Sequence, residues 1–237
     1  MGLEEGVSGR LYGIGVGPGD PELMTLKAVR ILAAVPVIAY PAPDEGESTA
    51  RRIAKNFLPA GRIEIAIRVP MRPGPEPARI YDCAAEEIAT HLGDGRDVAV
   101  LCEGDPFFYG SFSYLHERLA KRFPTTIVPG VSSLTACAAA SGRPLARRDD
   151  VLCVLPGTLP DERLEAHIRV ADSVAILKVG RHLKRLRALL GRLGLSERSA
   201  YVAHATWPQQ NFVALDALPA DEAPYFSMIL VSRGGAG

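Results

Sequence analysis

The chain has 237 residues and a mass of 25.4 kDa, which suits one large domain or two small ones. Its 27 basic and 27 acidic side chains cancel, which argues against a polyanion-binding surface over the whole protein, although a local basic pocket stays open. Apolar residues make up 47% of the chain, enough for a folded core, so global disorder is excluded.

Two features of the chain bear on its compartment. No apolar run reaches the roughly 18 residues of a membrane span, and the acidic first residues carry no apolar signal core. We therefore expect a cytoplasmic protein with no membrane partner and no nucleic-acid partner.

The four cysteines form no Cys-x-x-Cys pair, and none has a histidine at metal-ligand spacing. We expect all four to be small core residues in a reducing compartment, and we expect no metal site: Cys83, Cys102, Cys137 and Cys153.

In the first half of the chain, short strand-like apolar runs alternate with helical patterns, which is typical of an α/β protein. The predicted strands and helices, in chain order, are 11–16 (strand), 22–33 (helix), 35–40 (strand), 49–57 (helix), 62–69 (strand), 79–92 (helix), 97–102 (strand), 108–122 (helix) and 125–128 (strand). Asp20 is the predicted N-cap of the first helix, with Pro21 as its first residue. Four prolines within residues 70–77 predict a loop.

The pattern restarts after Pro129 and Gly130, so we place a boundary near Val128, with domains at residues 1–128 and 129–237. In the second half the predicted elements are 134–140 (helix), 151–155 (strand), 161–170 (helix), 173–179 (strand), 181–193 (helix), 199–204 (strand), 212–215 (strand) and 225–232 (strand). The tail at 234–237 is expected to fray.

Three turns each follow a predicted strand and precede a helix: residues 13–20, 103–106 and 129–133. Because ligands of open α/β sheets bind beyond the carboxyl ends of the strands, these turns predict one shared crevice. The first turn lacks both the glycine spacing of a dinucleotide-binding turn and the lysine of a phosphate-binding loop, and Asp20 would repel a phosphate. The turns offer backbone groups and two serine hydroxyls, which favours a zwitterionic ligand such as a nucleoside or an amino-acid derivative.

The same segments resemble the signature motifs of a known family. Residues 15–28 (GVGPGDPELMTLKA), 104–110 (GDPFFYG) and 129–133 (PGVSS) are similar, in this order, to the motifs of the tetrapyrrole methylases, the S-adenosylmethionine-dependent methyltransferases of sirohaem and cobalamin synthesis. Residues 141–145, 178–181 and 225–231 continue the resemblance, which spans about residues 9–233. It implies two α/β domains with the cofactor cleft between them, and a homodimer.

Within the family, the chain is most similar to the branch that methylates carbon 20 of precorrin-2 to give precorrin-3A, through residues 69–71, 101–111 and 225–227. The uroporphyrinogen-III branch usually carries Tyr-Asp after its second strand and Gly-Gly-Asp-Pro centrally. Here Tyr40 is followed by Pro41, and the central motif begins Glu103-Gly104. The alternatives are the same methylation on the cobalt-bound substrate, another acceptor such as uroporphyrinogen III, or a nucleoside-binding module without turnover.

The resemblance also implies contacts with S-adenosylmethionine, whose product would be S-adenosylhomocysteine. From the three turns these contacts are Pro18, Glu103, Gly104, Asp105, Phe108, Ser132 and Ser133, and from the second domain they are Val179 and Ala205. No residue is assigned as the catalytic base. An aspartate in Gly-Asp-Pro more often shapes its own turn than removes a proton, so we interpret Asp105 as a turn-shaping residue. His204 is the most notable of the five histidines, because it ends a predicted strand beside Ala205.

The tetrapyrrole substrate would carry several carboxylates, which predicts a local basic lining. Arg147 and Arg148, which follow a loop proline, are the preferred candidates. Four further basic residues are weaker candidates, because an ordinary solvated surface explains the last three at least as well: Arg143, Arg181, Lys184 and Arg185. For Tyr109 and Tyr114 the sequence leaves open whether they face the macrocycle or pack in the core.

Overall fold

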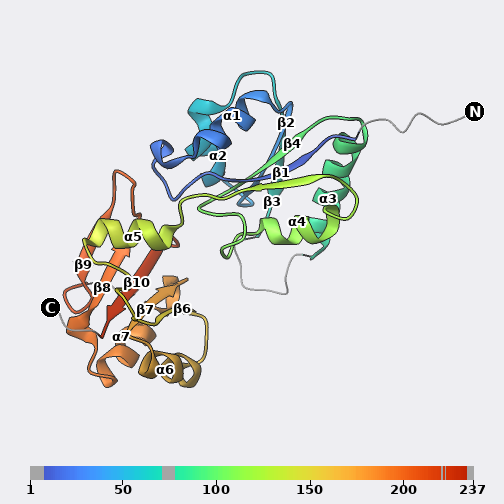
Figure 1. Ribbon diagram of the computed structural model, residues 1–237. Helices are drawn as coiled ribbons and strands as arrows, with labels where there is room; N and C mark the ends of the chain where they lie inside the picture. Colours follow the sequence, from blue (N-terminus) through green and yellow to red (C-terminus); the bar gives the residue numbers. More distant parts are fainter. Residues whose placement is uncertain (1–7, 71–77, 220, 222, 234–237) are drawn as a thin grey trace, which may run out of the picture. The chain divides into compact units, whose positions relative to one another are not determined.

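The computed structural model describes residues 8–70, 78–219, 221 and 223–233, and the chain divides into two compact units, Met1–Ser132 and Ser133–Gly237 (Figure 1). The division falls a few residues beyond the predicted boundary near Val128. The reason is that residues 129–132 continue the turn after the last strand of the first unit, where Gly130 is bonded to Asp105. The residues predicted as loop at 71–77 and as a frayed tail at 234–237 lie outside the described residues.

The first unit is built on a five-stranded parallel sheet with strand order β3-β2-β4-β1-β5. Its strands are β1 (Leu11–Gly15), β2 (Val37–Ala42), β3 (Ile63–Arg68), β4 (Val98–Cys102) and β5 (Thr125–Val128). Its α-helices are α1 (Leu26–Ala34), α2 (Thr49–Ala54), α3 (Ala78–Gly93) and α4 (Phe112–Leu119). Because β1 lies between β4 and β5, the carboxyl ends of these three strands are neighbours at one edge of the sheet.

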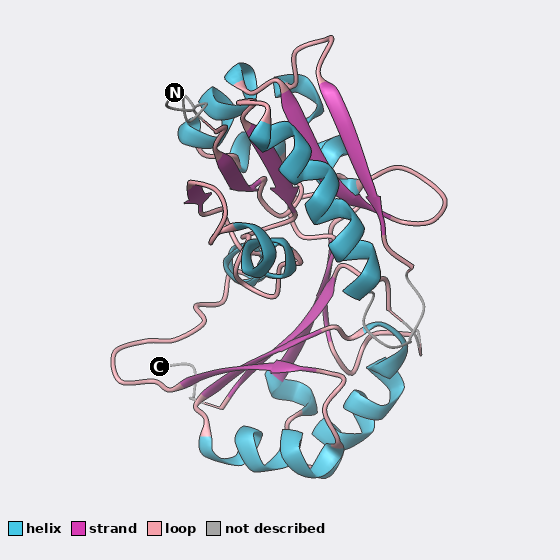
Figure 2. Ribbon diagram, turned by 90° about the vertical axis from the view of Figure 1, so that its right-hand side faces the viewer, coloured by secondary structure: helices cyan, strands magenta, loops and turns pink. Residues whose placement is uncertain are grey.

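Helices cover both faces of this sheet (Figure 2). Alternate residues of β4, among them Val98 and Val100, pack with α3 and α4 in one apolar cluster. The residues between them, Ala99 and Leu101, are fully buried on the opposite face, where α2 contacts β2 and β4. Burial on both faces explains why β4 is a continuous apolar run in the sequence.

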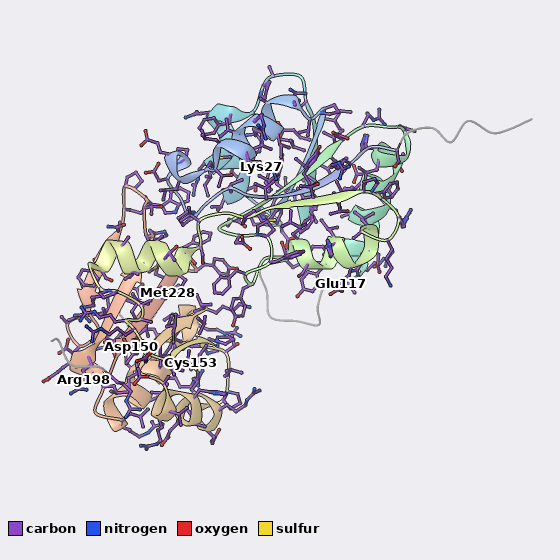
Figure 3. The ribbon with its side chains drawn as sticks, in the orientation of Figure 1. Lys27, Glu117, Asp150, Cys153, Arg198 and Met228 are labelled. Carbon is purple, nitrogen blue, oxygen red and sulfur yellow. The ribbon has the colours of Figure 1, made fainter. Side chains whose placement is uncertain are left out.

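The second unit is built on a mixed five-stranded sheet with strand order β6-β7-β10-β8-β9. Its elements are α5 (Ser133–Ser141), β6 (Leu152–Pro156), α6 (Asp161–Val170), β7 (Ser173–Leu177), α7 (Leu183–Arg192), β8 (Ser199–Ala203), β9 (Asn211–Ala214) and β10 (Ser227–Ser232). Helices α6 and α7 pack on one face, and α5 contacts β8 and β10. Met228 of β10, labelled in Figure 3, is 1% exposed. Both β7 and β8 run antiparallel to β10, so their carboxyl ends share an edge.

Two predicted helices were wrong at their starts. Asp20 caps a short 3₁₀ helix, Pro21–Leu23, and α1 begins only after Thr25, whose side chain accepts a hydrogen bond from the Ala28 N–H at 3.1 Å. The helix predicted from residue 108 begins at Phe112, because residues 105–111 form a turn held by side-chain bonds.

Other expectations hold in part. The basic helix predicted from residue 181 is a 3₁₀ turn, Gly180–His182, followed by α7. Cys102 and Cys137 are buried core residues as expected. Cys83 is exposed, because its position on α3 lies away from the face that packs on the sheet, and Cys153 is half-buried.

Candidate functional site

The three predicted turns meet at the carboxyl ends of β1, β4 and β5 in the first unit. The Gly104 N–H donates to the carbonyl of Gly17 at 2.8 Å, and the Gly17 N–H donates back to Gly104 at 3.3 Å. The Gly130 N–H donates to Oδ2 of Asp105 at 3.0 Å. These bonds join the first turn to the second and the second to the third.

Glycine is required at this junction because the backbones approach too closely for a side chain. A Cβ on Gly15 would lie 2.5 Å from the Gly130 nitrogen, and a Cβ on Gly130 would lie 2.0 Å from the Gly104 carbonyl oxygen. Gly17 and Gly104 also adopt positive φ angles of 82° and 65°. The glycine pattern therefore encodes the packing of the three turns.

Asp105 holds two of the turns with one side chain. Its Oδ1 accepts the Phe107 N–H at 2.9 Å, and its Oδ2 accepts the Gly130 N–H. Both carboxylate oxygens are therefore engaged by backbone groups, in agreement with the interpretation of Asp105 as a turn-shaping residue.

Glu103 follows directly after β4, and burial raises its pKa above the ordinary value. Its carboxylate accepts hydrogen bonds from its own backbone N–H and from that of Ala50 in the first turn of α2, and these bonds oppose the shift. Sequence reasoning placed Glu103 at the site but missed Ala50, because no local pattern shows where α2 lies against β4.

A second polar group in this unit escaped the sequence analysis entirely. Glu64 of β3 accepts hydrogen bonds from the Tyr40 hydroxyl at 2.7 Å and from Nε and Nη2 of Arg51 at 2.6 and 2.9 Å. Arg51 holds the pKa of Glu64 below its usual range, and burial raises the pKa of Tyr40. The one available signal was an acidic residue inside a strand pattern otherwise rich in isoleucine.

The remaining predicted cofactor residues lie as follows. In the first unit Pro18 is buried, and Phe108 and Ser132 are half-buried. In the second unit Ser133 is exposed at the start of α5, while Val179 and Ala205 are buried just beyond β7 and β8. The Val179 side chain belongs to the apolar core of its own unit, so only its backbone is available to a ligand.

His204 lies next to Ala205 with a positive φ of 50°, and its N–H donates to the Phe226 carbonyl at 2.8 Å. Lys178 and Thr206, at the same edge of the second sheet, also have positive φ angles, of 55° and 73°. Strained non-glycine backbone gathers at this edge, which is a common property of functional sites.

The candidate basic residues fall into two groups. Arg147 and Arg148 are exposed on a turn closed by Asp150 (labelled in Figure 3), whose Oδ2 accepts the Arg147 N–H at 2.8 Å. Arg185 forms an ion pair with Asp161, and Lys184 lies 3.6 Å from Asp221. These two pairings favour the solvated-surface interpretation for the basic helix.

The described residues hold neither a metal-ligand cluster nor a membrane-spanning helix. No group of three or more His, Cys, Asp or Glu side chains in that part of the chain is arranged to hold a metal ion. None of its helices is long and apolar enough to cross a membrane.

Comparison with known proteins decides the family. The family model described as Tetrapyrrole (Corrin/Porphyrin) Methylases matches residues 10–218. The chain belongs to the tetrapyrrole methylase family. A precorrin-2 C(20)-methyltransferase of Sinorhizobium sp is 40% identical over 94% of this chain and 95% of its own. A cobalt-precorrin-2 C(20)-methyltransferase of Salmonella typhimurium is 31% identical over 96% and 98% of the two chains.

Solved structures agree with this membership. The uroporphyrin-III C-methyl transferase of Thermus thermophilus, solved in complex with S-adenyl homocysteine, has a TM-score of 0.69 and 27% identity, covering 94% of this chain and 97% of its own. The fold found in this tetrapyrrole methylase therefore matches one that is known to hold the demethylated product of S-adenosylmethionine.

Proposed function

We propose that this tetrapyrrole methylase transfers the methyl group of S-adenosylmethionine to carbon 20 of precorrin-2, giving precorrin-3A and S-adenosylhomocysteine. The observation that carries the proposal is the junction of the three glycine turns, in a chain 40% identical to a precorrin-2 C(20)-methyltransferase. The homodimer and the cytoplasmic location expected from the sequence belong to this proposal as well.

The residues at the junction suit a cationic sulfonium ligand. The three turns hold the acidic residues Asp20, Glu103 and Asp105 and no lysine or arginine, so they offer a phosphate no cationic side chain and tolerate a positive charge. Pro18, Glu103, Gly104, Asp105, Phe108 and Ser132 of the first unit would hold the cofactor. Ser133, Val179 and Ala205 are proposed as its contacts from the second unit, and Arg147 and Arg148 as contacts of the substrate carboxylates.

The reaction requires the protein mainly to position the methyl donor and the methyl acceptor. Bound S-adenosylmethionine supplies a methyl group that is already activated on sulfur. The chain's part is to hold donor and acceptor in line and to exclude water. The turns serve this because their backbones are fixed to one another by hydrogen bonds and cannot drift apart. As the new carbon–carbon bond forms and the carbon–sulfur bond breaks, the proton of the methylated carbon must leave to the surroundings.

The second candidate is the same methylation on cobalt-bound precorrin-2, favoured by the 31% identity to the Salmonella typhimurium enzyme. Anaerobic incubation of the protein with S-adenosylmethionine and either metal-free or cobalt-loaded precorrin-2, read by mass spectrometry, separates the two. Gain of one methyl on the metal-free substrate alone supports the proposal, and gain on the cobalt-loaded substrate alone supports the alternative. No gain on either substrate rejects both.

A further inference from the structure

An exposed aromatic turn begins directly beside the junction of the glycine turns. Phe107 and Tyr109 are each 51% exposed, whereas Phe112, a few residues later, is fully buried. Tyr114, for which the sequence left the same two possibilities open, packs on Tyr81 with ring centroids 4.8 Å apart. Core packing therefore does not account for Phe107 and Tyr109, two large aromatic side chains that are exposed close together beside the proposed cofactor site.

The backbone of this turn is fixed in a strained form. Tyr109 has a φ of 56°, a left-handed conformation that bulky residues rarely adopt. The next residue, Gly110, has no room for a side chain, because a Cβ would lie 2.4 Å from the Pro106 carbonyl oxygen. Strained residues that the surrounding structure holds in place are concentrated at functional sites, so the strained backbone of Tyr109 indicates a functional role for its ring.

Hydrogen bonds hold the turn at both ends. Asp105 accepts the Phe107 N–H at the start, and the Ser113 hydroxyl donates to the Gly110 carbonyl at 3.1 Å at the end. The rings are held as well. Phe108 meets Tyr109 edge-on at 5.2 Å, and Phe107 meets His116 edge-on at 5.1 Å. The exposed rings are therefore presented on a rigid turn and not on a loose loop.

We infer that the ring of Tyr109, with Phe107 beside it, is a contact surface for the macrocycle of the tetrapyrrole substrate. This inference rests on the proposed function for the identity of the ligand. A conjugated macrocycle is flat and apolar on its faces and carries its carboxylates at its edge, so aromatic side chains match its faces. The turn starts at Asp105, which also fixes the third glycine turn, so one carboxylate sets the aromatic turn against the proposed cofactor site.

The test compares two substitutions of Tyr109. Both are compatible with the backbone conformation of the turn, but only one of them removes the aromatic ring. Asparagine tolerates a positive φ, so Tyr109→Asn keeps the turn and removes the ring, whereas Tyr109→Phe keeps the ring and removes only the hydroxyl. We expect Tyr109→Asn to raise the KM for precorrin-2 about tenfold, with kcat and the Kd for S-adenosylmethionine within about twofold of the wild type. Tyr109→Phe should leave all three within about twofold.

Equilibrium binding of metal-free precorrin-2, followed by its absorbance without S-adenosylmethionine, separates this inference from the proposed function. Turnover by the wild type with an unchanged KM in Tyr109→Asn overturns the inference alone. The inference is also overturned if Tyr109→Asn weakens the binding of S-adenosylmethionine as much as it raises the KM for precorrin-2, since the ring would then contact the cofactor. Binding that depends on the ring but yields no methylated product keeps the inference and rejects the proposed function. Absence of any tetrapyrrole binding by the folded wild type rejects both.

Discussion

Gly130 carries the tightest contact between the glycine turns, and its replacement gives the sharpest test at the level of one residue. Gly130→Ala would force a methyl group against the Gly104 carbonyl oxygen, 2.0 Å from the ideal Cβ position, and would push the second and third turns apart. We expect a loss of about 2 kcal/mol in the free energy of unfolding, as for other overpacked sites. Affinity for S-adenosylmethionine, measured by calorimetry, should fall at least about tenfold.

Gly93→Ala is the matched control, because nothing lies within 4 Å of its Cβ and it ends helix α3, far along the chain from the turns. It should leave both quantities unchanged or raise stability slightly. Equal effects of the two substitutions on S-adenosylmethionine affinity would contradict the proposed location of the cofactor site.

Glu103 gives a pH dependence whose sign follows from its environment. Because burial raises its pKa above the ordinary 4.5, the folded protein holds this proton more tightly than the unfolded chain does. The resulting stabilisation is fully present below the ordinary pKa and is lost as the pH rises through the raised value. Glu103→Gln keeps an acceptor for the Ala50 N–H but does not titrate, so wild type should lose stability relative to this variant as the pH rises. Urea unfolding from about pH 4 to about pH 7 measures the difference, and a difference independent of pH would refute the account.

At the level of elements, Glu64 fastens α2 to the sheet through Arg51 and Tyr40. Arg51 lowers the pKa of Glu64, so its stabilisation is present above the ordinary value of 4.5 and is lost as the pH falls through the lower value in the folded protein. Glu64→Gln should lower the free energy of unfolding by about 1 kcal/mol at neutral pH. The loss is modest because the side chains of Arg51 and Glu64 are each about one-third exposed, and solvent weakens their ion pair. The cost should shrink in acid. Glu117→Gln is the control and should be neutral, because Glu117, labelled in Figure 3, is an exposed residue of α4. A loss for Glu64→Gln that stays constant with pH would contradict the ionic origin.

The elements also show what the sequence could and could not predict. The strands of the first sheet were predictable because burial on both faces leaves continuous apolar runs such as β4. The predicted start of α1 was wrong because Asp20 and Pro21 can begin a 3₁₀ helix as readily as an α-helix. The N-cap of α1 itself is Thr25. The bonds from Glu103 to Ala50 and from Glu64 to Tyr40 could not be predicted, because they depend on strand neighbours and helix placement that are far apart in the sequence.

At the level of the whole molecule, the meeting of the three turns was predictable from sequence because each follows a strand of one parallel sheet. The exposed aromatic turn at 107–109 was not, because its residues fit a helical pattern as well as a turn. The proposed cofactor contacts stay predictions in both units, including Ser133, Val179 and Ala205 of the second unit, as do Arg147 and Arg148 for the substrate.

The position of the transferred methyl group tests the central claim most directly. The protein would be incubated anaerobically with precorrin-2 and S-adenosylmethionine carrying carbon-13 in its methyl group, and the product examined by carbon-13 NMR. We predict a single labelled methyl, attached to the meso carbon at position 20 of the macrocycle. A label on a pyrrole ring carbon, or a product without label from protein that still binds S-adenosylmethionine, would contradict the proposed function.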